Sequence, residues 1–227
     1  MSPSFTALVT GANRGLGLAV AAELYSRGHR VLVAARDKDA ATGAAELLGP
    51  RAVPLVLDVT DQASVDRAVG HAGTVDMLVN NAGVQLDWGQ SPSAVDLDVV
   101  RHTLDVNLLG AWRMARALVP GMVERGWGRV VNVSSGAASF AYGPAARCPA
   151  YSASKTALNA LTVMLAKETE GTGVLVNSVN PGLVRTRMRP DAERTVEEAA
   201  VPVADAATLP EGGPSGVFLR SSGTMPW

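Results

Sequence analysis

A tyrosine and a lysine stand four residues apart in the segment Tyr151-Ser152-Ala153-Ser154-Lys155. This spacing places a phenol and an ammonium group on one face of a helix, where they can act together. A phenol that exchanges a proton near pH 7 needs its pKa lowered from about 10 by about three units. That change corresponds to about 4 kcal/mol. A cation about 4 Å away at an effective dielectric of about 20 supplies roughly that energy. Tyr151 and Lys155 are therefore candidates for proton transfer.

Other polar residues could assist such a pair. Ser134 and Ser135 follow a run typical of a buried strand, so either hydroxyl could bind a carbonyl group at the edge of a sheet, or simply close the strand by turn chemistry. Asn107 falls inside a long helical stretch, where asparagine is a poor helix former and invites a reason. Binding a water molecule is one such reason.

A glycine-rich turn follows the first predicted strand, in the order Thr10-Gly11-Ala12-Asn13-Arg14-Gly15-Leu16-Gly17, and leads into a helix. Gly11 permits a tight turn, Gly15 lets the backbone approach a pyrophosphate, and Gly17 lets helix and strand pack closely. The free N–H groups at the start of the helix favour a phosphate. A chain with 23 glycines also forms tight turns for purely structural reasons.

The second predicted strand ends in Ala34-Ala35-Arg36, without the carboxylate that would accept a hydrogen bond from a free ribose 2′-OH. Arg36 and Arg14 could instead clamp a 2′-phosphate, which favours NADPH. The alternative is that Arg36 is a solvated residue paired with Asp37 or Asp39. Asp58, after the third strand, could bind the adenine amino group or cap a helix.

Short β-branched apolar runs alternate with Ala-rich helical stretches along the whole chain, which is the pattern of βαβ units. We predict an α/β fold: one domain over residues 1–227, with a Rossmann-type doubly wound parallel sheet of about seven strands and helices on both faces. The predicted strands are Phe5–Val9, Arg30–Ala34, Ala52–Leu57, Met77–Asn80, Arg129–Val133, Val174–Val179 and Val217–Leu219. The predicted helices are Leu16–Arg27, Asp37–Leu48, Asp61–His71, Ala94–Glu124, Ala150–Glu170 and Thr195–Thr208.

Two loops at the carboxyl edge of this sheet, 135–149 and 182–194, are candidates for substrate contact, or else mobile surface. The second loop holds Arg185, Arg187, Arg189 and Arg194, which could favour an acidic substrate or only face solvent. Trp88 could form a wall of the pocket or pack partly on the surface. Cys148 could face the substrate or act as a small buried hydrophobic residue.

Composition narrows the function classes. Among 227 residues, 47% are hydrophobic and 18% charged, with a formal charge of −1, so no global field attracts nucleic acid or anionic lipid. We expect no metal site, since the three histidines lack partners at ligand spacing. Apolar runs shorter than about 18 residues, the lack of a basic N-terminal segment and the single cysteine favour a cytoplasmic protein without membrane contact.

Taken together, these motifs resemble those of the short-chain dehydrogenase/reductase family over nearly the whole chain. Thr10 to Gly17 matches its glycine turn, Asn80-Asn81-Ala82-Gly83 its Asn-Asn-Ala-Gly segment, and Asn180-Pro181-Gly182 the segment beside the nicotinamide. By resemblance, Asn107, Ser135, Tyr151 and Lys155 are the catalytic tetrad. Tyr151 is then the proton donor, Ser135 orients the carbonyl, Lys155 binds the nicotinamide ribose and lowers the pKa of Tyr151, and Asn107 holds a relay water. The gap of 16 residues between Ser135 and Tyr151 is longer than in many members, which leaves Ser134 open as an alternative.

The resemblance also implies a cofactor, NADP(H), and a small-molecule carbonyl or alcohol substrate, in the manner of carbonyl reductases. A non-catalytic dinucleotide-binding regulator, an isomerase and a dehydratase remain alternatives on the same scaffold. Both a homo-oligomer (dimer or tetramer) and a monomer are compatible with the sequence. The expected cofactor-binding residues are Gly11, Asn13, Arg14, Gly15, Leu16, Gly17, Arg36, Asp58, Val59, Asn81, Ala82, Gly83, Tyr151, Lys155, Pro181, Gly182, Val184 and Thr186.

Overall fold

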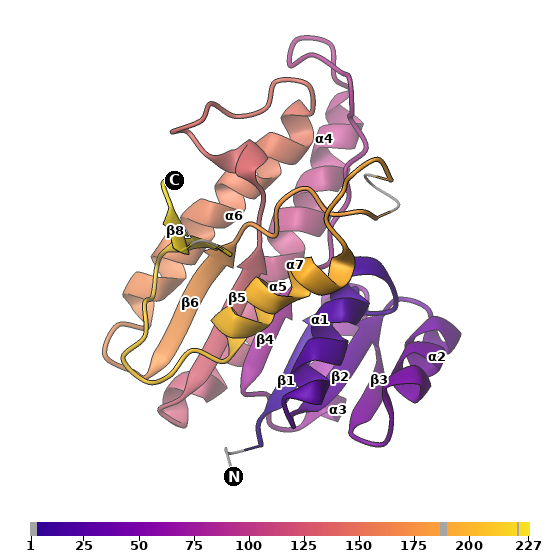
Figure 1. Ribbon diagram of the computed structural model, residues 1–227, viewed down its shortest axis with the longest axis vertical. Coiled ribbons are helices and arrows are strands. Elements are labelled where there is room, and N and C mark those ends of the chain that lie inside the picture. Colours follow the sequence, from indigo (N-terminus) through magenta and orange to yellow (C-terminus); the bar gives the residue numbers. More distant parts are fainter. Residues whose placement is uncertain (1–3, 187–189, 222) are drawn as a thin grey trace.

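One eight-stranded sheet in the order β3-β2-β1-β4-β5-β6-β7-β8 forms the centre of the protein (Figure 1). The computed structural model describes residues 4–186, 190–221 and 223–227. All neighbouring strands are parallel except β7 and β8. The strands are β1 (Thr6–Thr10), β2 (Arg30–Ala35), β3 (Ala52–Val56), β4 (Met77–Asn80), β5 (Gly128–Val133), β6 (Val174–Val179), β7 (Phe218–Arg220) and β8 (Gly223–Met225).

Helices cover both faces of this sheet. Alternate residues of a strand point to opposite faces, so Leu8 packs into the core beneath α3, α5 and α6, while Ala7 and Val9 pack into the core beneath α1, α2 and α7. Figure 1 shows α1 and α7 side by side on one face. The helices are α1 (Gly15–Ser26), α2 (Lys38–Leu48), α3 (Gln62–Ala72), α4 (Leu97–Leu104), α5 (Gly110–Glu124), α6 (Pro149–Glu168) and α7 (Val196–Ala207).

The α/β class, the doubly wound parallel sheet and the single domain are confirmed, and three details differ from prediction. An eighth strand, β8, pairs antiparallel with β7 and forms that edge of the sheet. The predicted helix Ala94–Glu124 starts later and is divided into α4, a π-helical turn over Asp105–Leu109, and α5. A short 3₁₀ turn, Gly136–Ala138, also lies in a segment expected to be loop.

A ladder of buried polar side chains crosses the middle of the sheet. The Asn80 amide donates to Asn132 Oδ1 (2.9 Å), the Asn132 amide donates to Thr162 Oγ1 (2.9 Å), and the Thr162 and Ser178 hydroxyls are 2.8 Å apart. Asn80, Asn132 and Ser178 are aligned partners in β4, β5 and β6. The polar ladder thus links three strands to α6 in the interior of the protein.

No helix in the described part of the chain combines the length and apolar character needed to cross a membrane.

Candidate active site

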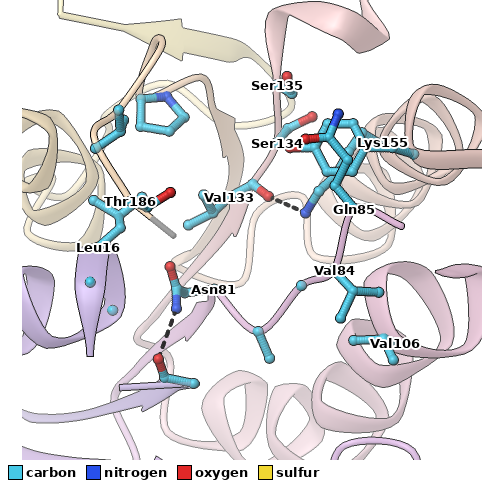
Figure 2. Close-up of a pocket in the computed structure, with 18 of the residues that line it drawn as sticks. Leu16, Asn81, Val84, Gln85, Val106, Val133, Ser134, Ser135, Lys155 and Thr186 are labelled. Carbon is cyan, nitrogen blue, oxygen red and sulfur yellow. Dashed lines mark hydrogen bonds between the residues drawn. The ribbon is translucent and has the colours of Figure 1, made fainter. Parts of the chain in front are cut away.

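A cavity of about 880 Å³ opens at the carboxyl ends of the strands, over the point where the strand order reverses between β1 and β4. Its walls include every residue that the sequence analysis assigned to cofactor binding, together with Ser135. Of the predicted tetrad, only Asn107 lies outside the wall. Figure 2 shows that Leu16, Asn81, Thr186, Ser135 and Lys155, which come from distant parts of the chain, converge on this space.

The glycine turn is fastened to the end of β4. The Thr10 hydroxyl accepts hydrogen bonds from the backbone N–H groups of Asn81 and Ala82 (3.0 Å each), and the Asn81 amide donates to the Thr10 carbonyl (2.9 Å). A Cβ on Gly17 would lie 2.3 Å from the carbonyl oxygen of Gly11 and 2.4 Å from Asn81 Nδ2. The close contact between the turn and β4 therefore requires glycine at position 17.

The N-terminus of α1 is open to a ligand. Side chains cap α2, α3, α4 and α7, at Asp37, Asp61, Asp96 and Thr195 respectively. In contrast, α1 has no capping side chain and no acidic residue in its first turn. Its free N–H groups and positive dipole end therefore face the cavity without an anionic partner, which suits a phosphate.

Around the far end of the glycine turn, Arg14, Arg36 and Asp58 all line the cavity. Asp37 caps α2 through the Ala40 N–H (2.8 Å), and no ion pair joins Arg36 to Asp37 or Asp39 among the described residues. Asp58 does not cap α3. Its carboxylate instead accepts two hydrogen bonds from Thr60. Partial burial acts to raise the pKa of Asp58, but the Thr60 hydrogen bonds and the charges of Arg36 and Arg113 outweigh it and hold the pKa below its ordinary value.

Tyr151 and Lys155 lie in the first two turns of α6, on the face that lines the cavity. Lys155 is buried, and its Nζ donates to the Val133 carbonyl (2.7 Å) and lies 5.9 Å from the centre of the Tyr151 ring. Ser135 lies close enough to Tyr151 to lower the pKa of the phenol, and the Ser135 Oγ accepts a hydrogen bond from the Ala137 N–H (3.2 Å). Ser134 lines the same cavity, but its buried Oγ has no partner in the described structure. Of the two serines, Ser135 is the one that acts on the pKa of the phenol.

Burial governs the protonation of both groups. It raises the pKa of Tyr151 above its ordinary value, against the lowering effect of Ser135. It also lowers the pKa of Lys155 to about 8. The expectation that Lys155 lowers the pKa of Tyr151 stays a prediction. A phenol with a raised pKa is protonated at neutral pH and can donate a proton.

Asn107 occupies the π-helical turn behind the cavity wall. Its amide oxygen accepts from the Val84 N–H (2.8 Å), and its amide nitrogen donates to the Val84 carbonyl and to Ser154 Oγ (2.9 Å each). The side chain that the sequence analysis assigned to a relay water is therefore engaged with protein groups. It ties the segment after β4 to α6.

The loop after β6 contributes Pro181, Gly182, Leu183, Val184 and Thr186 to the wall. Arg185 donates to the carbonyls of Ala192 and Glu193, and Arg194 donates to those of Pro181 and Glu198. These two arginines hold the loop together instead of presenting a cation to the cavity. Arg187 and Arg189 lie outside the described residues.

The remaining wall, called here the substrate end, was predicted in part from the sequence. It comprises Val84, Gln85, Leu86, Trp88, His102, Val106, Ala137, Gly143, Ala145, Cys148 and Leu183. Of these, Trp88 and Cys148 were named as candidates from the sequence, and Ala137, Gly143, Ala145 and Leu183 fall in the candidate loops 135–149 and 182–194. Cys148 is also buried, as its alternative role required. The residues that the sequence analysis missed are Val84, Gln85, Leu86, His102 and Val106, which come from two segments, and no local pattern marks them as part of the site.

Comparison with known proteins agrees with this site. The profile of the short chain dehydrogenase family matches residues 5–197. The chain is 33% identical over 222 residues to the 3-oxoacyl-[acyl-carrier-protein] reductase FabG of Vibrio harveyi, covering 95% of this chain and 89% of that protein. Among solved structures, the NADPH-bound carbonyl reductase from chicken fatty liver is 27% identical, with a TM-score of 0.87 and 99% of both chains covered. The 3-ketoacyl-(acyl-carrier-protein) reductase from Brucella melitensis complexed with NADH is 28% identical, with a TM-score of 0.88 and 96% of both chains covered.

The protein therefore belongs to the short-chain dehydrogenase family, and its class is that of an oxidoreductase acting on a carbonyl group.

Proposed function

We propose that this protein is an NADPH-dependent reductase that converts a ketone or aldehyde into an alcohol. The observation that carries the proposal is one continuous cavity, with an uncapped helix N-terminus and two arginines at one end and a protonated Tyr151 beside Ser135 at the other. The relatives named as 3-oxoacyl and carbonyl reductases support the same chemistry.

In this proposal, the coenzyme NADP(H) supplies the hydride when bound. The glycine turn and the N-terminus of α1 would hold its pyrophosphate, Arg14 and Arg36 its 2′-phosphate, and Asp58 its adenine. Asn13, Val59, Ala82 and Gly83 complete the nucleotide wall, and Val184 and Thr186 the nicotinamide wall. The open space around Gly15, where an added Cβ would meet only Thr186 at 3.9 Å, fits the close approach of a phosphate.

Tyr151 would protonate the substrate oxygen while Ser135 holds that oxygen by a hydrogen bond. Lys155 places a cation behind the phenol and would stabilise the phenolate left after proton transfer. In this proposal, Asn107 has a structural role. Its three hydrogen bonds hold Val84 in the cavity wall and Ser154 in α6.

The substrate end favours a neutral molecule. Its described side chains are mostly apolar, with Gln85 and His102 as the polar exceptions, and neither Arg185 nor Arg194 points a free cation into it. A carboxylate placed there would lose its hydration without gaining a strong partner. We therefore assign the protein to uncharged ketones and aldehydes rather than keto acids.

The test is oxidation of NADPH followed by absorbance against a panel of neutral carbonyl compounds, with NADH in parallel. Turnover of at least one ketone or aldehyde, faster with NADPH, is the expected result. Tight NADPH binding without turnover of any carbonyl would instead support a dinucleotide-binding regulator. Conversion of a substrate without a net change in NADPH would support an isomerase or dehydratase.

A further inference from the structure

Asp87 lies in the loop after β4 and is completely buried. Its Oδ2 accepts hydrogen bonds from the backbone N–H groups of Ala150 (2.6 Å) and Tyr151 (3.3 Å), in the first turn of α6. Its Oδ1 makes no hydrogen bond in the described structure. The two amides of α6 are therefore the hydrogen-bond partners of this carboxyl group.

This contact replaces a local helix cap. The N-cap residue of α6 is Cys148, whose side chain makes no capping hydrogen bond, and Pro149 occupies the first position of the helix. Free N–H groups at a helix start need acceptors, and a carboxylate also interacts favourably with the positive dipole end. Asp87 supplies that acceptor from 63 and 64 positions away in the chain.

Two further contacts fasten the same two segments. The Gly89 N–H donates to the Arg147 carbonyl (2.7 Å), and the Arg147 guanidinium lies 5.7 Å from the centre of the Trp88 ring. Residues 87–89 and 147–151 are therefore joined as one unit, with Trp88 and Tyr151 both on the cavity wall.

We propose that Asp87 is a positioning residue for the reaction: it fixes the start of α6, and so sets where the Tyr151 hydroxyl lies relative to the substrate end. The inference rests on the proposed function, in which Tyr151 donates the proton. A displacement of about 1 Å at a reacting group can lower a rate by roughly 100-fold.

The test compares Asp87→Ala, Asp87→Asn and a matched control, Asp61→Ala. Asp61 likewise caps a helix through two amides, those of Ala63 and Ser64 (3.1 Å each), but does not line the cavity. Both alanine variants are expected to lower Tm by about 2–6 °C. Only Asp87→Ala should lower kcat, by roughly 10- to 100-fold, with the NADPH Kd within about twofold of the parent value. Asp87→Asn keeps an oxygen acceptor and should restore kcat to within a few-fold.

Hydrogen exchange gives a readout that does not depend on turnover. The peptide covering residues 147–155 should exchange faster in Asp87→Ala than in the parent, and not in Asp61→Ala. Equal kcat in the two alanine variants, or unchanged exchange in that peptide, would overturn the proposal. If Asp87→Ala does not fold, Asp87→Ser, whose hydroxyl is too short to serve both amides, takes its place. A parent protein that reduces no carbonyl compound overturns the proposed function instead, while the exchange result still decides whether Asp87 fixes α6.

Discussion

Burial raises the pKa of Tyr151, Ser135 acts in the opposite direction, and Lys155 Nζ lies 5.9 Å from the centre of the tyrosine ring. Removing only the hydroxyl separates its role in proton transfer from its role in packing. In Tyr151→Phe, we expect kcat to fall by about 100-fold or more, because the general acid is lost. NADPH binding, measured by fluorescence titration, should stay nearly unchanged. Turnover close to that of the parent protein would remove Tyr151 from the mechanism.

Arg36 is exposed at the rim of the cavity, in the place where the sequence analysis predicts a 2′-phosphate contact. Arg36→Asp should shift the ratio of kcat/KM for NADPH over NADH toward NADH by one to a few kcal/mol. The charge-assisted hydrogen bond is lost and repulsion is added. Arg30→Asp, a substitution in β2 away from the cavity wall, is the charge-matched control. An unchanged ratio in Arg36→Asp would show that the phosphate is recognised by other residues.

The pKa of Lys155 predicts an alkaline limit to activity. The folded protein releases this proton near pH 8, whereas an exposed lysine keeps it to 10.5. The unfolded chain therefore binds more protons between these values, so the Lys155 contribution to folding stability rises with pH across that window. We expect kcat/KM for NADPH to fall above pH 8 while this group does not lower Tm.

The measurement is kcat/KM for NADPH from pH 6 to 10, with Tm recorded in parallel without coenzyme. Lys155→Arg, which stays charged throughout this range, should lack the limb near pH 8 even if its activity is lower. A profile that stays flat to pH 9.5 in the parent protein would contradict the assignment.

At the scale of elements, the glycine turn and β4 share a contact that no other residue type permits at position 17. Gly17→Ala should destabilise the fold by about 1–3 kcal/mol and weaken NADPH binding, since the turn must move away from Asn81. Gly43→Ala is the matched control, because Gly43 lies in α2 with open space around it and should gain about 0.5–1 kcal/mol. Thermal unfolding and NADPH titration of both variants test this. Equal NADPH affinity in both would argue against the role of the turn.

Elements defined by local periodicity were predictable, and those defined by distant contacts were not. The seven parallel strands have continuous apolar runs, so their order in the chain indicates βαβ units. The π-helical turn contains Asn107, whose side chain bonds to Val84 and Ser154, 23 and 47 positions away. Asparagine in a predicted helix called for an explanation, but the sequence analysis expected one continuous helix over Ala94–Glu124. β8 consists of three residues and pairs with β7, and so short a strand shows no recognisable hydrophobic periodicity in the sequence.

The same distinction applies to the site. The glycine turn, the Tyr151 and Lys155 pair, and Arg36 each have a local motif, and all line one cavity. Asp87 has none, because its partners are backbone amides that any sequence carries. The role of Arg185 and Arg194 could be assigned only from the structure. In the sequence, an arginine that bonds to loop carbonyls looks the same as one that binds a ligand.

For the whole molecule, the distribution of charge in the cavity predicts substrate preference. A neutral keto ester should have a kcat/KM at least about tenfold above that of the matching free keto acid, because the substrate end offers no free arginine among the described residues. Paired assays at constant ionic strength measure this ratio. Arg185→Gln should leave the ratio unchanged. A keto acid reduced as well as its ester would contradict a neutral-substrate site.

The polar ladder of Asn80, Asn132 and Ser178 has a consequence for assembly of the sheet. Apart from the polar ladder, β4, β5 and β6 consist mostly of aliphatic residues, with Arg129 and Asn177 as buried polar exceptions. Sliding one strand by two positions would therefore keep most of these side chains on the same faces. Such a slip would place an amide opposite valine or leucine. The amide would then be buried without hydrogen-bond partners, which is energetically unfavourable. These three side chains therefore favour one register of the strands. Because the cavity lies at the ends of the same strands, its width depends on that register.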